Sequence, residues 1–169
     1  MSQRAEQLAA RLDEELSRMG EFVSGLTAAQ LDAACKDPRG VTVRHVLDHL
    51  REGIDLLLTW SDSVTSGSPA GVDVPAPHTH AHSHDPANAA ADVATTVAAL
   101  REGGSAFVST VRGLTDQQLD SSPPPTESLT NGSTPLHEIV AFIADDVAGH
   151  LTHLKEAVGA GARVHQDAT

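Results

Sequence analysis

The stretch TPLHEIVAFIADDVAGHLTHLKEAV, residues 134–158, decides the fold of this chain because it predicts a long amphipathic helix. Thr134 is a good N-cap, and Pro135 at the first helical position already has the φ angle that a helix needs. Apolar residues then recur at steps of three and four, which places them in one continuous stripe. The stripe predicts a core face made of Leu136, Val140, Ile143, Val147, Leu151, Leu154 and Val158.

Ionisable side chains lie on the same side of this predicted helix. With about 100° between successive residues, His150 falls inside the apolar stripe and Asp146 lies on its edge one turn earlier, so both are expected to face the interior. His153 lies further out on the same flank. A carboxylate or imidazolium that faces a core is costly unless it is paired or binds a metal. Asp146 and His150 therefore either form a hydrogen bond with each other or share a cation with a ligand from another helix.

Three further stretches show the same spacing of apolar residues. We expect helices over residues 3–25, 42–65 and 86–113, in addition to 134–158. Aromatic residues are scarce and Ala, Leu and Val dominate, which favours closely packed helices over a sheet. The predicted fold class is therefore all-α, and the architecture is a four-helix bundle.

The chain contains an internal repeat. GLTAAQLD begins at Gly25 and GLTDQQLD at Gly113, each after a long predicted helix and each with a T-x-x-Q capping box that starts a short helical turn. Each copy is followed by a loop, a capping Thr, a His three residues later and another long helix. The bundle is therefore expected to consist of two similar helix-turn-helix halves, with its second and fourth helices meeting near the middle.

The second long helix supplies a further candidate ligand. His49 lies off the centre of that helix's apolar stripe but on a flank from which it can face inward, whereas His45 points further toward solvent. For either histidine alone, a role on the helix surface or in capping is the alternative. Where the second and fourth helices meet, His49 is expected to converge with Asp146 and His150.

A segment of different composition separates the two halves. Residues 66–85 are rich in Pro, Gly and Ser and have no apolar period, so they predict a mobile loop. On an extended chain its alternate histidines project the same way and can hold Zn²⁺ or Ni²⁺ loosely, but short His tracts also occur as solvated linkers. These histidines are His78, His80, His82 and His84.

Two adjacent glycines interrupt good helix formers within the third predicted helix. Gly103 precedes Gly104, which occupies a core position of the stripe. A glycine in a helix interior costs about 1 kcal/mol relative to Ala. The interpretations are a close approach of the backbone to a neighbour, room for a bound group, or a helix kink.

Length and charge exclude several classes of function. The 169 residues fit one domain, expected over 1–158, with a patternless and therefore disordered tail over 159–169. A formal net charge of −12 with only 11 Lys and Arg argues against a nucleic-acid partner or an anionic membrane, and favours a small ligand. Cys35 is the only cysteine, and the N-terminus has no continuous apolar run that would form a signal peptide or an anchor. We therefore expect a cytoplasmic protein.

Two pieces of the chain carry a family resemblance. GLTAAQLDAACKDPRGVTVRHVLDHLREG, from Gly25, and STPLHEIVAFIADDVAGHLTHLKEA, from Ser133, resemble the two diagnostic segments of the DinB-like (YfiT-like) four-helix-bundle superfamily. Within it they look most like the N-terminal metal-binding domain of mycothiol-dependent maleylpyruvate isomerase. Members of this kind hold a metal, often zinc or nickel, with one His of the second helix and two ligands four residues apart on the fourth. The resemblance therefore implies His49, Asp146 and His150 as metal ligands.

The sequence also departs from that pattern. Many members have His, and the isomerase-like branch has Glu, at the position of Asp146. The sequence does not include the second domain of the isomerase. The shorter Asp146 changes the metal geometry that the resemblance implies. The missing second domain weakens the inference that this chain catalyses the isomerase reaction.

The implied site leads to hypotheses of different classes. Two imidazoles and one carboxylate leave positions of a cation open, as catalytic sites do, and the family implies that a low-molecular-weight thiol such as mycothiol is activated there. The leading hypothesis is a metal-dependent enzyme for S-transfer to, or isomerisation of, a small electrophile, with His153 as a proton acceptor near the open position. The alternatives are a non-catalytic metal-binding or stress-response module with a metal-handling His-rich loop, and a structural Asp146–His150 pair. The sequence identifies neither the metal nor the electrophile, and it leaves open whether the chain forms a homodimer.

Overall fold

The computed structural model describes residues 2–35, 41–66, 93–123 and 132–166, and these ranges contain helices and no strand. Four of these helices are long and two are short, which confirms the predicted all-α class. In chain order the helices are α1 (Gln3–Ser24), α2 (Ala28–Leu31), α3 (Val43–Ser66), α4 (Val93–Gly113), α5 (Asp116–Leu119) and α6 (Leu136–Gln166). Within the described ranges, no helix is both long enough and apolar enough to cross a membrane.

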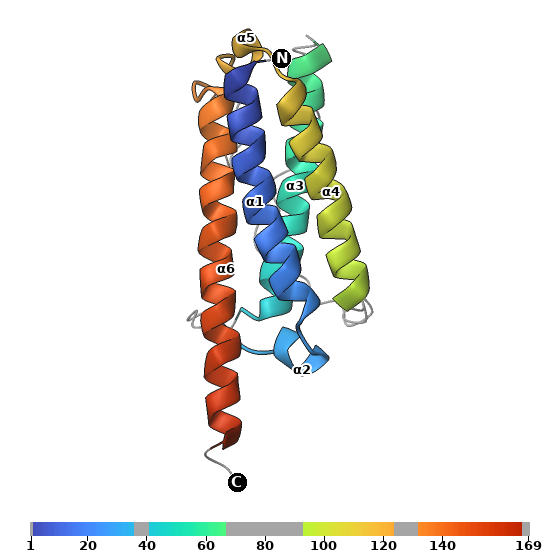
Figure 1. Cartoon of the computed structure of the whole chain (residues 1–169), viewed down its shortest axis with the longest axis vertical. Helices are drawn as coiled ribbons and strands as arrows, with labels where there is room; N and C mark the ends of the chain where they lie inside the picture. The colour runs from blue at the N-terminus through green and yellow to red at the C-terminus, as the bar shows by residue number, and fades with distance from the viewer. Residues whose placement is uncertain (1, 36–40, 67–92, 124–131, 167–169) are drawn as a thin grey trace.

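The four long helices form a bundle in which each has two neighbours. α1 packs against α4 and α6, and α3 packs against the same two helices, so α1 and α3 lie at opposite corners. Figure 1 shows α1 and α6 running in one direction and α3 and α4 in the other. The contact between α1 and α4 is the most extensive of the four, and that between α3 and α6 is the sparsest. The second and fourth helices are thus neighbours, as expected, but the flank between them is loosely closed.

The buried side chains follow the predicted stripes. On α6, Leu136, Val140, Val147 and Leu154 are each at most 2% exposed. They pack against the apolar faces of the other long helices, where Phe107 of α4 is among the largest fully buried side chains. Burial of such stripes is the main source of stability for a bundle with few aromatic residues.

The internal repeat appears as two matching corners. In the first, the Thr27 hydroxyl accepts a hydrogen bond from the Gln30 N–H, and the Gln30 side chain accepts one from the Thr27 N–H at 2.9 Å. In the second, Thr115 and Gln118 make the same two bonds, the latter again at 2.9 Å. Both predicted capping boxes are therefore confirmed, and each turns the chain from one long helix toward the next.

Gly104 is buried where α4 lies against α1. A Cβ added at this glycine would lie 3.1 Å from Leu16 Cδ1, so the small residue permits the close approach of the two helices. Leu16 lies nine residues before Gly25, and Gly104 lies nine residues before Gly113. The two therefore occupy equivalent positions of the repeat and pack against each other. Of the three interpretations of Gly104, the structure supports close approach to Leu16, and Gly104 also lines a pocket beside this contact.

Two helix boundaries differ from the prediction. The tail over 159–169 was expected to be disordered, but α6 continues to Gln166, since alanine and arginine favour a helix and no proline ends it. Pro135 was expected at the first helical position, but α6 begins at Leu136. The Pro135 carbonyl accepts bonds from the N–H groups of Glu138 and Ile139, so Pro135 itself precedes the helix as its cap. Residues 86–92, predicted to begin the third helix, lie outside the described residues.

Candidate functional site

α3 and α6 bring His49 and His150 together across their sparse contact. The two ring centroids are 5.8 Å apart, and the ring planes are inclined by 71°, so the imidazoles meet edge to face. His49 is exposed, and 24% of the His150 side chain is exposed. The two helices therefore supply one imidazole each to the same small region of the surface.

Asp146 completes this cluster from the preceding turn of α6. Its Oδ2 lies 3.4 Å from His150 Nε2, and 42% of its side chain is exposed. The helical spacing predicted that this pair faces the interior, and in the structure both side chains are partly buried. Because α3 and α6 contact each other so sparsely, the pair lies at the open edge of the bundle and is accessible to solvent.

The electrostatics of the cluster favour an ionised Asp146. The hydrogen bond with His150 lowers the pKa of the Asp146 carboxyl below its ordinary value of 3.8, while partial burial opposes this by raising the pKa. Positive charge on His150, and to a smaller extent on His49, lowers the pKa further. Asp146 is therefore a carboxylate at neutral pH, with imidazole nitrogens beside it.

This donor set has the chemistry of a divalent-cation site. Imidazole and carboxylate groups together suit Zn²⁺ or Ni²⁺, and contributions from two helices are typical of bundle metal sites. In the part of the chain that the structure describes, however, no group of three or more His, Cys, Asp or Glu side chains is arranged so that it could hold a metal. Asp146 and His150 contact each other with the same atoms that would face a cation. The three residues fit a cation by chemical type, and holding one requires that this hydrogen bond open and that the side chains rearrange.

The other candidate histidines lie in different surroundings. His153 is exposed on α6, and no described hydrogen bond or ion pair joins it to the cluster. His45 is half-buried and His49 is exposed, which reverses the expected order. His137 Nδ1 lies 3.0 Å from the Leu119 carbonyl, so this ring ties α6 to the corner at α5. The alternate histidines of residues 66–85 lie outside the described residues.

One apolar residue beside the cluster was missed by the sequence analysis. Phe142 is 57% exposed and is the exposed large hydrophobic residue of the described surface. It lies one turn before Asp146 on α6, which places both on one face of the helix. The spacing of four residues between Phe142 and Asp146 was the signal that would have identified it.

Comparison with known proteins agrees with the all-α architecture. The sequence model of the DinB superfamily matches residues 11–154, a range that contains His49, Asp146, His150 and His153. No curated protein and no solved structure matches the chain. Since the match covers most of the sequence, the chain belongs to the DinB superfamily.

Proposed function

We propose that this protein is a cytoplasmic, metal-dependent enzyme that activates a low-molecular-weight thiol of the mycothiol type. The reaction is S-transfer to a small electrophile, or its isomerisation by addition and elimination of the thiol. The observation that carries the proposal is the convergence of His49 and His150 from two helices beside the ionised carboxylate of Asp146. A cluster of this kind at an accessible edge is open to small substrates.

The roles of the residues follow from their chemistry. His49, Asp146 and His150 would hold a divalent cation such as zinc or nickel. When bound, the cation would supply Lewis acidity that lowers the pKa of a thiol. His153 is exposed on the same helix, three residues beyond His150, where it accepts the thiol proton and passes it to water. Phe142, exposed one turn before Asp146, contacts the apolar part of the electrophile.

A second candidate function is favoured by a different observation. Asp146 and His150 contact each other directly, and the described side chains form no assembled group of three metal ligands. This is what a non-catalytic metal-binding or stress-response module would need, because its site would capture and release a cation and would not hold one permanently. The four alternate histidines, His78 to His84, would then deliver the metal.

The test uses untagged full-length protein in which His78, His80, His82 and His84 are all replaced by Ser, so that this tract contributes no metal. We expect elemental analysis to find a single zinc or nickel ion per chain, and His49→Ala to lose it. A conjugation assay with mycothiol and an electrophile such as 1-chloro-2,4-dinitrobenzene should show thiol consumption that stops on chelation and returns with added zinc. Bound metal without any thiol consumption would favour the non-catalytic module. A protein without bound metal, even after zinc is added, would leave Asp146 and His150 as a structural pair.

A further inference from the structure

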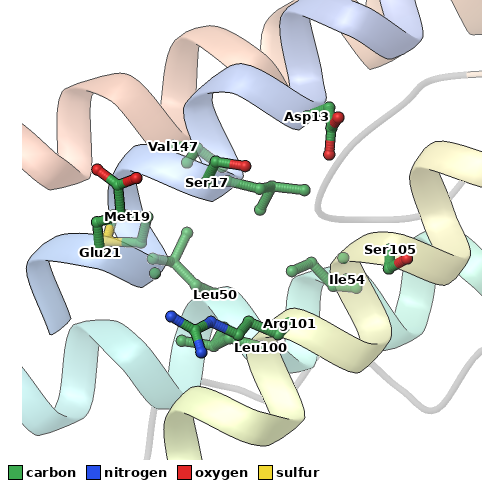
Figure 2. A pocket seen from close by; sticks show the side chains of 13 residues that line it. Asp13, Ser17, Met19, Glu21, Leu50, Ile54, Leu100, Arg101, Ser105 and Val147 are labelled. Atoms are coloured by element: carbon green, nitrogen blue, oxygen red, sulfur yellow. The ribbon is translucent and has the colours of Figure 1, made fainter. Parts of the chain in front are cut away.

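A pocket of about 280 Å³, open to solvent, lies along the contact between α1 and α4 and reaches buried side chains of α3 and α6 at its base. Figure 2 shows Leu50, Ile54, Leu100 and Val147 projecting toward it from α3, α4 and α6. Its size is close to the lower end, about 300 Å³, of the range for small-molecule sites. The α1–α4 pair lies opposite the α3–α6 pair in the bundle, so this cavity and the His49–His150 cluster open on different sides.

The cation at the rim of the cavity is Arg101 of α4 (Figure 2). Its Nη2 donates a hydrogen bond to the Ser24 hydroxyl at 3.1 Å. In the described part of the chain this guanidinium has no carboxylate partner within ion-pair distance, although Glu21 also lines the cavity. Other described arginines, among them Arg4, Arg11, Arg18, Arg44 and Arg112, form ion pairs with carboxylates.

The remaining charges restrict the class of ligand. Asp13 and Glu21 line the cavity from α1 and are exposed. Their charges, together with the net charge of −12, disfavour a phosphate ester or any other ligand with several negative charges. A single carboxylate needs only one guanidinium, whose planar donor pair matches the two carboxylate oxygens. The apolar side chains at the base of the pocket suit a hydrocarbon group on the rest of the ligand.

We propose that this cavity binds a medium-chain monocarboxylate. The carboxylate pairs with the Arg101 guanidinium at the rim, and the alkyl chain lies among Leu50, Ile54, Leu100 and Val147. Leu50 and Val147 directly follow His49 and Asp146 in the chain, so the ligand contacts the inner faces of the same two helices. The proposal does not depend on a bound metal.

The probe for the test is octanoate, below its micelle concentration, added to chelator-treated full-length protein with labelled methyl groups. We expect saturable shifts of the Ile54 and Leu100 methyl resonances, and affinity that rises about fourfold for each methylene from butanoate to octanoate. Octan-1-ol should bind at least about fivefold more weakly than octanoate because it lacks the charge, and octylammonium should bind no better than the alcohol. Shifts that do not saturate, or octylammonium that binds as tightly as octanoate, would overturn the proposal.

Three variants assign the contacts. Arg101→Gln should reduce octanoate affinity to that of octan-1-ol without changing binding of the alcohol, whereas the matched control Arg112→Gln, on the same helix but paired with Glu6, should change neither. Ser105→Phe, at an exposed rim position, should block all the ligands while leaving the helical circular dichroism intact. If Arg101→Gln and Arg112→Gln have the same effect, or if Ser105→Phe folds and still binds octanoate, the cavity is not the site. Because the protein is metal-free, none of these outcomes bears on the proposed thiol chemistry.

Discussion

Leu16 of α1 and Gly104 of α4 are equivalent residues of the two halves, and they pack directly against each other. The distance of 3.1 Å from Leu16 Cδ1 to a Cβ built on Gly104 is shorter than ordinary van der Waals contact. A leucine facing a glycine lets the two helices approach closely along the most extensive contact of the bundle. The repeat therefore cannot carry large side chains at both of these positions.

Replacing Gly104 with leucine should destabilise the protein by about 2 kcal/mol, because overpacking a close helix contact forces side chains out of their rotamers. Urea unfolding followed by circular dichroism measures the change. The exchange variant Leu16→Gly with Gly104→Leu should recover part of the loss, since one large side chain again faces a glycine. Gly149→Ala, in a helix position with nothing within 4 Å of the new Cβ, should instead stabilise by about 0.5–1 kcal/mol. Equal stability of Gly104→Leu and wild type would contradict the close contact.

The two capping boxes should contribute alike. Thr27→Ala and Thr115→Ala each remove the hydroxyl that accepts a bond from the third residue of a short helix, and each should cost about 1 kcal/mol. The same unfolding experiment compares them, with Thr152→Ala on the exposed face of α6 as the control that should change stability little. A cost at only one of the two corners would mean that the halves, although alike in sequence, are stabilised differently.

Much of the fold is predictable from the sequence because its signals are local. The apolar stripe of α6 and the T-x-x-Q boxes at Thr27 and Thr115 depend on residues within a turn or two of one another. How closely each pair of helices packs is not a local property, because it depends on residues far apart in the sequence. Close approach was one of three interpretations of Gly104, and its partner Leu16 lies 88 positions away and looks like any other core residue.

The sequence predicted which residues form the candidate site, but it predicted only part of their environment in the structure. Helical spacing placed Asp146 next to His150, and the repeat placed His49 within reach. The exposure of all three was not predictable, because it results from the sparse packing of α3 against α6. The pocket beside Arg101 had only one signal in the sequence, Gly104, because its apolar walls come from four helices and look like ordinary core positions.

The roles of His150 and His153 are separable by substitution. On an α-helix His150 is about 40° around the axis from Asp146 and one turn along it, whereas His153 is about 20° away but two turns along, roughly 10 Å. A cation reached by bonds of about 2 Å cannot easily take both Asp146 and His153. His150→Ala should therefore abolish bound metal in elemental analysis, and His153→Ala should retain the metal while lowering thiol consumption by about 10²-fold or more. Full metal in both variants, or loss in His153→Ala alone, would contradict the ligand assignment.

In metal-free protein, Asp146 should titrate below its ordinary value of 3.8, as measured from the ¹³C shift of its carboxyl. His150→Ala removes the hydrogen bond and the adjacent charge but leaves the partial burial, so the pKa should rise to 3.8 or above. His49→Ala removes the smallest of the contributions and should raise it less. An unchanged pKa in His150→Ala would show that the hydrogen bond seen in the structure does not persist in solution.

The same shift predicts how stability depends on pH. Because folding lowers the pKa of Asp146, its ionised form stabilises the fold at pH values above 3.8, and this contribution is lost as the pH falls through the lower folded-state pKa. The difference in unfolding free energy between wild type and Asp146→Asn should therefore be largest near neutral pH and shrink toward zero in acid. Asp145→Asn is the matched control at the adjacent exposed position, where the carboxylate pairs with Arg11. The effect of this substitution on the unfolding free energy should be the same with and without His150. Repeating the comparison in the His150→Ala background should remove the dependence for Asp146, and its persistence there would mean that another group stabilises the carboxylate.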